Sequence, residues 1–360
     1  MHQKLIDFLR KNHKITMADF IQFALHSEDA YYINKNPFKN SQISHEGDFI
    51  TAPELSQIFG ELVAIWIIHH WELLNKPAKI NLIELGPGKG TLLQDILVVA
   101  KKFPSFLNSI SISLLEINEI LQDSQKNILS KYPTIPVKWY KNIDSLLGNI
   151  DNIPTIVYSN EFFDALPTNQ FQYKKQKWHE VIFTLQNNKI TLGYQELQTI
   201  NNYNFLPLLP TEYDFYEYSL DTINIFTALV NTVLKNTGAM LTIDYGYNEI
   251  NKTNTIRGFS KHKVLDINEI IQHIGNVDIT YNVNFYELCK ILQQQNIQYS
   301  INTQKQFLEN MGLDHRAKIL LANMTEAEQN NLYSVLNLLT NENEMGNKFK
   351  VLEFICTKEI

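Results

Sequence analysis

The feature that most constrains this chain is a buried-strand pattern that runs into a glycine-rich turn. Residues 80–91 read Ile-Asn-Leu-Ile-Glu-Leu-Gly-Pro-Gly-Lys-Gly-Thr, so an apolar run carries the acid Glu84 and is followed by Gly86, Gly88 and Gly90. An amphipathic helical pattern begins directly behind the last glycine. Strand, tight turn and helix in this order let bare backbone approach a nucleotide-like ligand closely. The pattern therefore predicts a nucleoside-cofactor site.

Three kinds of glycine-rich loop compete for this turn. A phosphate-binding P-loop needs Gly-Lys followed directly by Ser or Thr, but Gly90 separates Lys89 from Thr91. A dinucleotide fingerprint needs a third glycine three places after the second, and Thr91 occupies that place. The remaining loop, an acid followed by Gly-x-Gly-x-Gly, is typical of enzymes that bind S-adenosylmethionine (SAM). Its glycines would leave bare backbone beside the aminoacyl tail, with Glu84 near the ammonium; a plain strand-turn-helix packed by glycines stays open.

A second acid, Glu116, follows the glycine turn at the separation along the chain that a nucleoside-binding fold would have. Residues 110–116 form another short apolar run that ends in Glu116, one helix's length after the glycine turn. In nucleoside-binding α/β folds the acid at the end of the second strand binds both ribose hydroxyls. This spacing predicts that Glu116 binds the ribose.

The wider pattern predicts an α/β fold. Strands are expected at 80–85, 110–116, 135–139, 153–158 and 239–244, with helices between them. Alternation on this scale favours a parallel, Rossmann-like sheet with helices on both faces. The sequence Thr51-Ala-Pro-Glu54 predicts a capping-box start of a helix that runs to about Leu74.

The alternation of strand and helix is interrupted once, which suggests an insertion. Two strand-like runs joined at Gln186-Asn-Asn188 predict a β-hairpin. The length of 360 residues suggests about two domains. We expect an N-terminal helical region with a site-closing loop at 1–75, a SAM-binding core at 76–167 and 213–360, and a substrate or lid subdomain at 168–212.

Composition narrows the partners and the location. The net charge of −7 and the absence of a basic run disfavour a nucleic-acid partner. Cys289 and Cys356 lie far apart, so no metal site is expected and a reducing compartment is the simple interpretation. The N-terminus resembles neither a signal nor a transit peptide, and the longest apolar run, 62–68, is too short to span a bilayer. We expect a cytoplasmic protein without membrane insertion.

Polar side chains lie at or just after the ends of two predicted strands, 153–158 and 239–244. The segment Asn160-Glu-Phe-Phe-Asp-Ala-Leu-Pro167 brings two carboxylates and an amide to the carboxyl edge of the predicted sheet. Glu161 and Asp164 would share a face if this turn were helical. Asp244 ends a later strand, and Asp48 and Glu54 are candidates to close over the ligand from the N-terminal side. The alternative is an ordinary helix start capped by Asn160.

Together these segments resemble the MidA-type (NDUFAF7-like) family of SAM-dependent methyltransferases, formerly a domain of unknown function. The resemblance covers nearly the whole chain. Its matching motifs include Gly47-Asp-Phe-Ile-Thr-Ala-Pro-Glu54, Glu84-Leu-Gly-Pro-Gly-Lys-Gly-Thr91, Asn160-Glu-Phe-Phe-Asp-Ala-Leu-Pro167, Asp244-Tyr-Gly246 and the stretch from Asp278 to Phe285. The resemblance implies the class I SAM-methyltransferase fold, with an N-terminal helical extension and an inserted subdomain that contains the β-hairpin. It also implies transfer of a methyl group to an arginine of a protein substrate, for which a respiratory complex I subunit is a candidate.

This resemblance and the residue patterns together define a predicted site. The catalytic candidates are Glu161 and Asp164, followed by Asp244, because a carboxylate must localise the guanidinium charge or accept its proton. The predicted cofactor-binding residues are Glu84, Gly86, Pro87, Gly88, Gly90, Thr91, Glu116, Asn160 and Asp48. Three alternatives remain: a SAM-binding assembly factor without catalysis, a small-molecule methyltransferase, and a nicotinamide-dependent oxidoreductase, which Thr91 disfavours.

Overall fold

The computed structural model of the chain describes residues 1–28, 30–34, 51–198, 203–260 and 263–357. The chain divides into two compact units, which we describe one at a time. Unit 1 comprises Met1–Phe49, Phe163–Ile225 and Tyr247–Leu288, and unit 2 comprises Ile50–Phe162, Phe226–Gly246 and Cys289–Ile360. The division into functional domains expected from the sequence, with its insertion at 168–212, stays a prediction.

Unit 2 is built around a mostly parallel sheet. Its strands lie in the order β15-β16-β10-β5-β2-β3-β4, in which β10, β5, β2, β3 and β4 are mutually parallel. Strands β16 and β15 complete the sheet in antiparallel pairing. The strands are β2 (Ile80–Leu85), β3 (Ile110–Leu115), β4 (Val137–Tyr140), β5 (Thr155–Asn160), β10 (Gly238–Tyr247), β15 (Tyr299–Thr303) and β16 (Phe349–Cys356).

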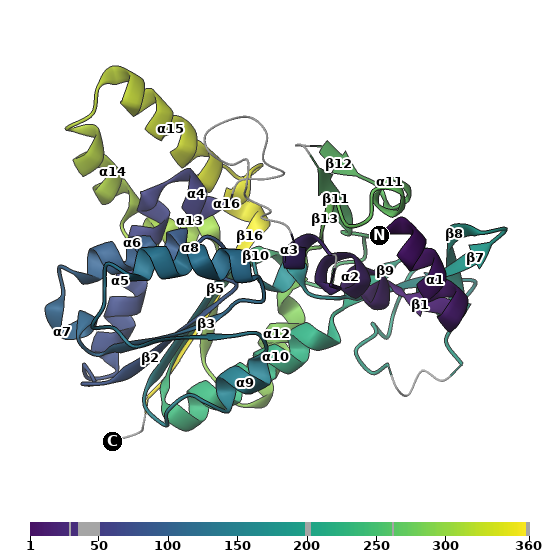
Figure 1. Ribbon diagram of the computed structural model, residues 1–360, viewed down its shortest axis with the longest axis horizontal. Helices are drawn as coiled ribbons and strands as arrows, with labels where there is room; N and C mark the ends of the chain where they lie inside the picture. The colour runs from purple at the N-terminus through teal and green to yellow at the C-terminus, as the bar shows by residue number, and fades with distance from the viewer. Residues whose placement is uncertain (29, 35–50, 199–202, 261–262, 358–360) are drawn as a thin grey trace. The chain divides into compact units, whose positions relative to one another are not determined.

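Helices lie on both faces of this sheet (Figure 1). Helices α5, α6 and α8 lie over one face, and α9 and the unit 2 part of α10 lie over the other (Figure 1). The helices are α4 (Ala52–Leu55), α5 (Gln57–Leu73), α6 (Thr91–Ala100), α7 (Pro104–Leu107), α8 (Glu119–Leu129), α9 (Ile143–Leu147), α10 (Leu220–Asn236), α12 (Phe285–Gln294), α13 (Gln304–Asn310), α14 (Leu313–Leu321), α15 (Glu326–Thr340) and α16 (Met345–Lys348). The predicted α/β fold with helices on both faces is confirmed.

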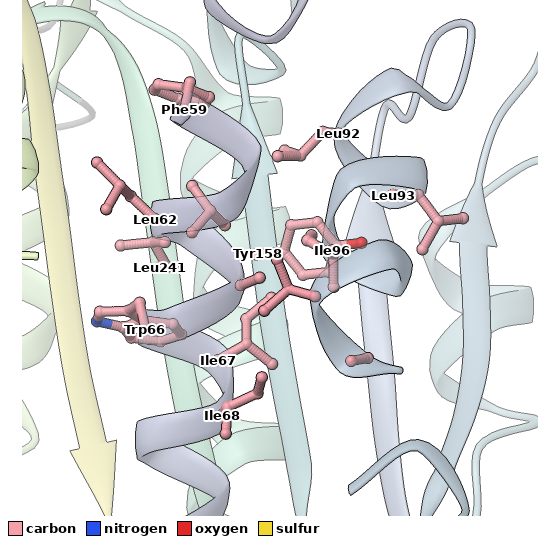
Figure 2. Close-up of a cluster of buried hydrophobic side chains, with 14 of the residues drawn as sticks. Phe59, Leu62, Trp66, Ile67, Ile68, Leu92, Leu93, Ile96, Tyr158 and Leu241 are labelled. Atoms are coloured by element: carbon pink, nitrogen blue, oxygen red, sulfur yellow. The ribbon is translucent and has the colours of Figure 1, made fainter. Parts of the chain in front are cut away.

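The core of unit 2 packs one helical stripe against the sheet. Phe59, Leu62 and Trp66 recur on α5 at helical spacing and are almost fully buried, together with Ile96 on α6 and Leu241 on β10 (Figure 2). Burying an apolar side chain of this size contributes about 1.5–3 kcal/mol. This packing fixes the helix that follows the glycine turn and the strand that precedes it.

The helix expected from Thr51 to about Leu74 is not continuous. Ser56 adopts an extended conformation (φ −160°, ψ 135°) between α4 and α5, and its side chain caps α5 by accepting from the Ile58 amide. Thr51 forms no side-chain cap. The break turns α4 out of line with α5, and Glu54 on α4 then reaches the glycine turn, as described below.

Unit 1 contains two antiparallel sheets. The first has the order β1-β7-β6-β9 with β8 paired to β7, and the second has the order β12-β11-β13. The pairing of β7 with β8 confirms the predicted hairpin. The elements are α1 (His2–Asn12), α2 (Met17–His26), α3 (Tyr31–Asn34) and α11 (Ile267–Gln272), the 3-10 helix η1 (Phe163–Ala165), and strands β1 (Lys14–Thr16), β6 (Asn169–Lys174), β7 (Lys177–Gln186), β8 (Lys189–Glu196), β9 (Phe215–Tyr218), β11 (Arg257–Ser260), β12 (Lys263–Leu265), β13 (Asp278–Thr280) and β14 (Val283–Asn284).

Candidate functional site

The glycine turn between β2 and α6 has a backbone that other residues adopt only with strain. Gly86 and Gly90 have φ angles of 62° and 86°, in the left-handed region. A Cβ atom added to Gly86 would also come within 3.0 Å of the Phe162 ring. The turn therefore presents bare backbone, and Phe162 from the Asn-Glu-Phe-Phe segment packs directly against it.

Three side chains from neighbouring helices fix the glycine turn. Glu54 on α4 accepts hydrogen bonds from Lys89 Nζ (2.9 Å) and Thr91 Oγ1 (2.5 Å). On α8, Ser124 Oγ donates to the Lys89 carbonyl (3.0 Å), and Gln125 Nε2 donates to the Gly88 carbonyl (2.6 Å). The turn is thus clamped from two sides, and Glu54 contacts the turn that carries the predicted cofactor residues.

Glu84 on β2 is a buried acid directly before the turn. Only 3% of its surface is exposed, and Tyr158 on the neighbouring strand β5 donates a hydrogen bond to its carboxylate (2.9 Å). Burial raises the pKa of Glu84 to about 8; the Tyr158 hydrogen bond lowers it, and the charge of Glu116 raises it further. Such a carboxyl gains from a cationic partner, because the cation offsets the cost of burying its charge.

Glu116 follows β3 and is hydrogen-bonded to the glycine turn. Its Oε1 accepts from the Asn118 amide (2.9 Å), its Oε2 lies 3.4 Å from Gln125 Nε2, and it also accepts from the Gly88 amide. Burial raises the pKa of Glu116 to about 7, against these hydrogen bonds, which lower it. Since each carboxylate oxygen has two acceptor sites, these bonds orient the acid and leave acceptor capacity for hydroxyl groups.

The predicted helical turn across Glu161 and Asp164 does not form. Glu161 has a left-handed backbone (φ 52°), and the 3-10 helix begins only at Phe163. Asn160 Nδ2 donates to Glu161 Oε1 (3.1 Å), so the amide orients this carboxylate at the end of β5. The shared face expected from a spacing of three is therefore wrong, because a left-handed residue cannot continue into the helix.

Asp244 on β10 supports the backbone of the Asn160-Glu-Phe-Phe segment. It is fully buried, its Oδ2 accepts from the Phe162 amide (3.2 Å), and its Oδ1 accepts from the Tyr245 amide (2.9 Å). The Glu161 amide donates to the carbonyl of Ile243 on the same strand (3.0 Å). Asp244 thus orients the backbone that carries Glu161.

Asp164 belongs to unit 1, where it has its own partners. Thr280 Oγ1 donates to Asp164 Oδ2 (2.7 Å). Burial raises the pKa of Asp164 to about 6, while the Thr280 hydrogen bond and the charge of Arg257 lower it. Tyr281 donates to the carbonyl of Phe163 (3.0 Å), so this unit also orients the start of the 3-10 helix.

The structure brings most of the predicted site residues together at the carboxyl edge of the unit 2 sheet. Strands β2, β3, β5 and β10 end there in parallel, and a ligand in such a sheet binds beyond these ends. Asp48 lies outside the described residues. The predicted residues at this edge are Glu84, Gly86, Pro87, Gly88, Gly90, Thr91, Glu116, Asn160, Glu161 and Asp244.

Sequence reasoning missed the supporting residues Tyr158, Ser124 and Gln125. Tyr158 pairs in register with Glu84, so strand pairing would have placed the two side chains together. The two residues on α8 carried no comparable signal, because a polar residue on a helix after a cofactor strand has many possible orientations.

Comparison with known proteins identifies the family. Residues 62–302 match the family described as S-adenosyl-L-methionine-dependent methyltransferases. The chain belongs to this family. It is therefore a SAM-dependent methyltransferase, as the glycine turn predicted.

Curated relatives of this methyltransferase extend the match to almost the whole chain. The mitochondrial protein arginine methyltransferase NDUFAF7 of Xenopus tropicalis is 32% identical over 98% of this chain and 84% of its own length. The human protein of the same name is 31% identical over 97% of this chain and 82% of its own length. The prediction of a cytoplasmic location is wrong, because these relatives are named as mitochondrial proteins.

Solved structures confirm the methyltransferase fold. A superfamily member from Burkholderia thailandensis, crystallised with S-adenosyl-homocysteine, superposes with a TM-score of 0.80 at 18% identity. The superposition covers 99% of this chain and 91% of that one. In the described part of the present chain, no helix is long and apolar enough to cross a membrane.

The residues at the sheet edge fit the SAM cofactor chemically. Glu84 is a buried acid of the kind that an ammonium group would pair with, Glu116 is a buried carboxylate with the acceptor capacity that ribose hydroxyls would use, and the glycine turn between them carries no side chains at residues 86, 88 and 90. The Oδ1 atom of Asn160 is buried and has no hydrogen-bond partner among the described residues. A buried acceptor without a partner calls for a donor that a ligand would supply.

Proposed function

We propose that this methyltransferase modifies an arginine side chain of a protein substrate. The proposal draws on the curated relatives, which are named protein arginine methyltransferases. Within the chain, the observation that carries it is a carboxylate, Glu161, oriented by Asn160 and placed next to the segment that packs on the glycine turn. The family resemblance further implies a respiratory complex I subunit as the substrate, which we include in the proposal.

The proposed cofactor side uses the residues at the sheet edge. Bound SAM supplies a sulfonium methyl group as the electrophile. Glu84 would pair with the ammonium group, Glu116 with the ribose, and the residues of the glycine turn with the aminoacyl tail. Because Phe162 packs on Gly86, the cofactor turn and the carboxylate segment would also keep a constant spacing.

The proposed acceptor side relies on carboxylates. An arginine guanidinium is protonated in water, with a pKa above about 12, so its nitrogen is a poor nucleophile. Glu161 would pair with the guanidinium, localise its charge and set its direction of approach. The acceptor nitrogen would form the new N–C bond as the S–C bond breaks, and the proton it loses would pass to a carboxylate.

The other two predicted catalytic acids would have different roles. Asp244 is fully buried and bonded to the Phe162 and Tyr245 amides, which suits a residue that positions Glu161. Asp164, with a pKa raised to about 6 by burial, would be ionised at neutral pH and able to accept a proton.

The variant Glu161→Gln tests this assignment. We expect methyl transfer to fall at least about 100-fold while SAM affinity changes only a few-fold, since the amide keeps the shape and loses the charge. Methyl transfer is measured as the incorporation of radioactive methyl groups into an extract from cells that lack the protein. SAM affinity is measured by calorimetric titration. The matched control is Glu196→Gln on the surface of unit 1. Unchanged turnover would refute the role of Glu161, and label on residues other than arginine would refute the acceptor.

A further inference from the structure

A buried acid behind the glycine turn has no role in the site described so far. Asp95 lies on α6, one helical turn after Thr91, and only 5% of its surface is exposed. A Cβ atom added to Gly60 on α5 would lie 2.4 Å from the Asp95 Cβ, so the glycine makes room for this side chain. Asp95 Oδ2 is buried and has no hydrogen-bond partner within the described residues.

The charges around Asp95 are unbalanced. The negative charges of two other acids, Glu61 on α5 and Glu54 on α4, act on the Asp95 carboxyl group. Each of them has a cation of its own: Arg316 on α14 forms a two-bond pair with Glu61 (2.5 and 2.8 Å), and Lys89 pairs with Glu54 (2.9 Å).

In the part of the chain that the structure describes, no lysine or arginine pairs with Asp95. The three carboxylates therefore face two cations, and the cluster is neutral only while Asp95 carries a proton. Burial, with the charges of Glu61 and Glu54 adding to it, raises the pKa of Asp95 to about 7.

We propose that Asp95 is a positioning residue of the cofactor site: its proton keeps Glu54 bound to the glycine turn, and loss of that proton loosens the turn. An ionised Asp95 repels Glu54, which bridges Lys89 and Thr91 across the start of α6. Because SAM needs the ordered turn, binding favours the protonated form of Asp95. By linkage, the contribution of Asp95 to SAM affinity is present at low pH and is lost as the pH rises through about 7.

The test compares SAM affinity in wild type and Asp95→Asn across pH by calorimetric titration. Glu84, Glu116 and SAM itself titrate in both proteins, so the ratio of the two dissociation constants isolates Asp95. At about pH 5.5 we expect the two proteins to bind SAM with equal affinity. At about pH 8.5 the variant should bind SAM at least about threefold more tightly than wild type, since asparagine mimics the protonated acid. A ratio that stays constant with pH would overturn the proposal.

Two further variants separate positioning from a general structural effect. Glu54→Gln should weaken SAM binding and abolish the pH-dependent ratio, because Glu61 remains beside Asp95 but no carboxylate that holds the glycine turn is left for Asp95 to repel. A ratio that persists would refute the route through Glu54. Asp123→Asn, in an exposed pair with Lys126, is the matched control and should leave the affinity unchanged. These measurements follow SAM binding alone, so they are independent of whether arginine is the acceptor.

Discussion

The glycine turn at 86–90 and the carboxylate segment at 160–165 both carry predicted site residues, yet they are supported differently. The turn is clamped entirely within unit 2, by Glu54 and by two residues of α8. The segment passes from unit 2 to unit 1 after Phe162, and its second half depends on bonds from Thr280 and Tyr281. The predicted cofactor residues of the turn are therefore supported within one unit, whereas the two carboxylates of the segment, Glu161 and Asp164, are supported in different units.

The largest effect is expected at the turn itself. Gly86→Val should lower SAM affinity more than about 100-fold, because a left-handed valine costs about 1–2 kcal/mol and its side chain collides with Phe162. Calorimetric titration of SAM measures the loss. The control Gly193→Ala, whose added Cβ would lie an ordinary 3.7 Å from Ile182, should bind normally. Near-normal SAM binding by the Gly86 variant would show that the turn tolerates side chains. The glycine turn would then not be more tightly constrained than the carboxylate segment.

A smaller effect is expected where α8 supports the turn. Gln125→Leu removes the donor to the Gly88 carbonyl and the acceptor of the Trp139 Nε1 bond (2.8 Å), and so leaves two partly buried polar groups without these partners. Each such group costs about 1–3 kcal/mol, so we expect SAM affinity to fall about tenfold. The exposed Gln293→Leu serves as the control in the same titration. If both variants bind equally well, α8 contributes nothing to the turn.

The smallest effect is expected in unit 1, at the partner of Asp164. Thr280→Ala removes a hydrogen bond that lowers the pKa of Asp164, so this pKa should rise above its value of about 6. If the ionised acid is the active form, the rising limb of the pH–rate profile moves to higher pH. We expect about twofold lower methylation near pH 6.5 and no change near pH 8, with SAM affinity unaltered. The exposed Thr253→Ala is the control, and a profile that does not move would remove Asp164 from the acid–base chemistry.

Much of the fold, the cofactor and the glycine turn of the candidate site could be predicted from the sequence, because they depend on local pattern. Strands with acids at Glu84 and Glu116 and glycines at alternate positions leave few other structures for the backbone. The helix from Thr51 was predicted less well: Ser56 breaks it, and the favourable contact of Glu54 with Lys89 and Thr91 forms across 35 or more residues. No local propensity reports such a contact.

The sequence by itself determined the sheet, the glycine turn and the cofactor class, since these follow from short-range periodicity and from the backbone freedom of glycine. Only the tertiary structure decided that Glu161 lies outside the helical turn, that Asp244 supports the backbone of that segment, and that Asp164 bonds to Thr280 within unit 1. Burial produced the raised pKa values of Glu84, Asp95 and Asp164, because desolvation depends on which residues pack around a carboxyl group.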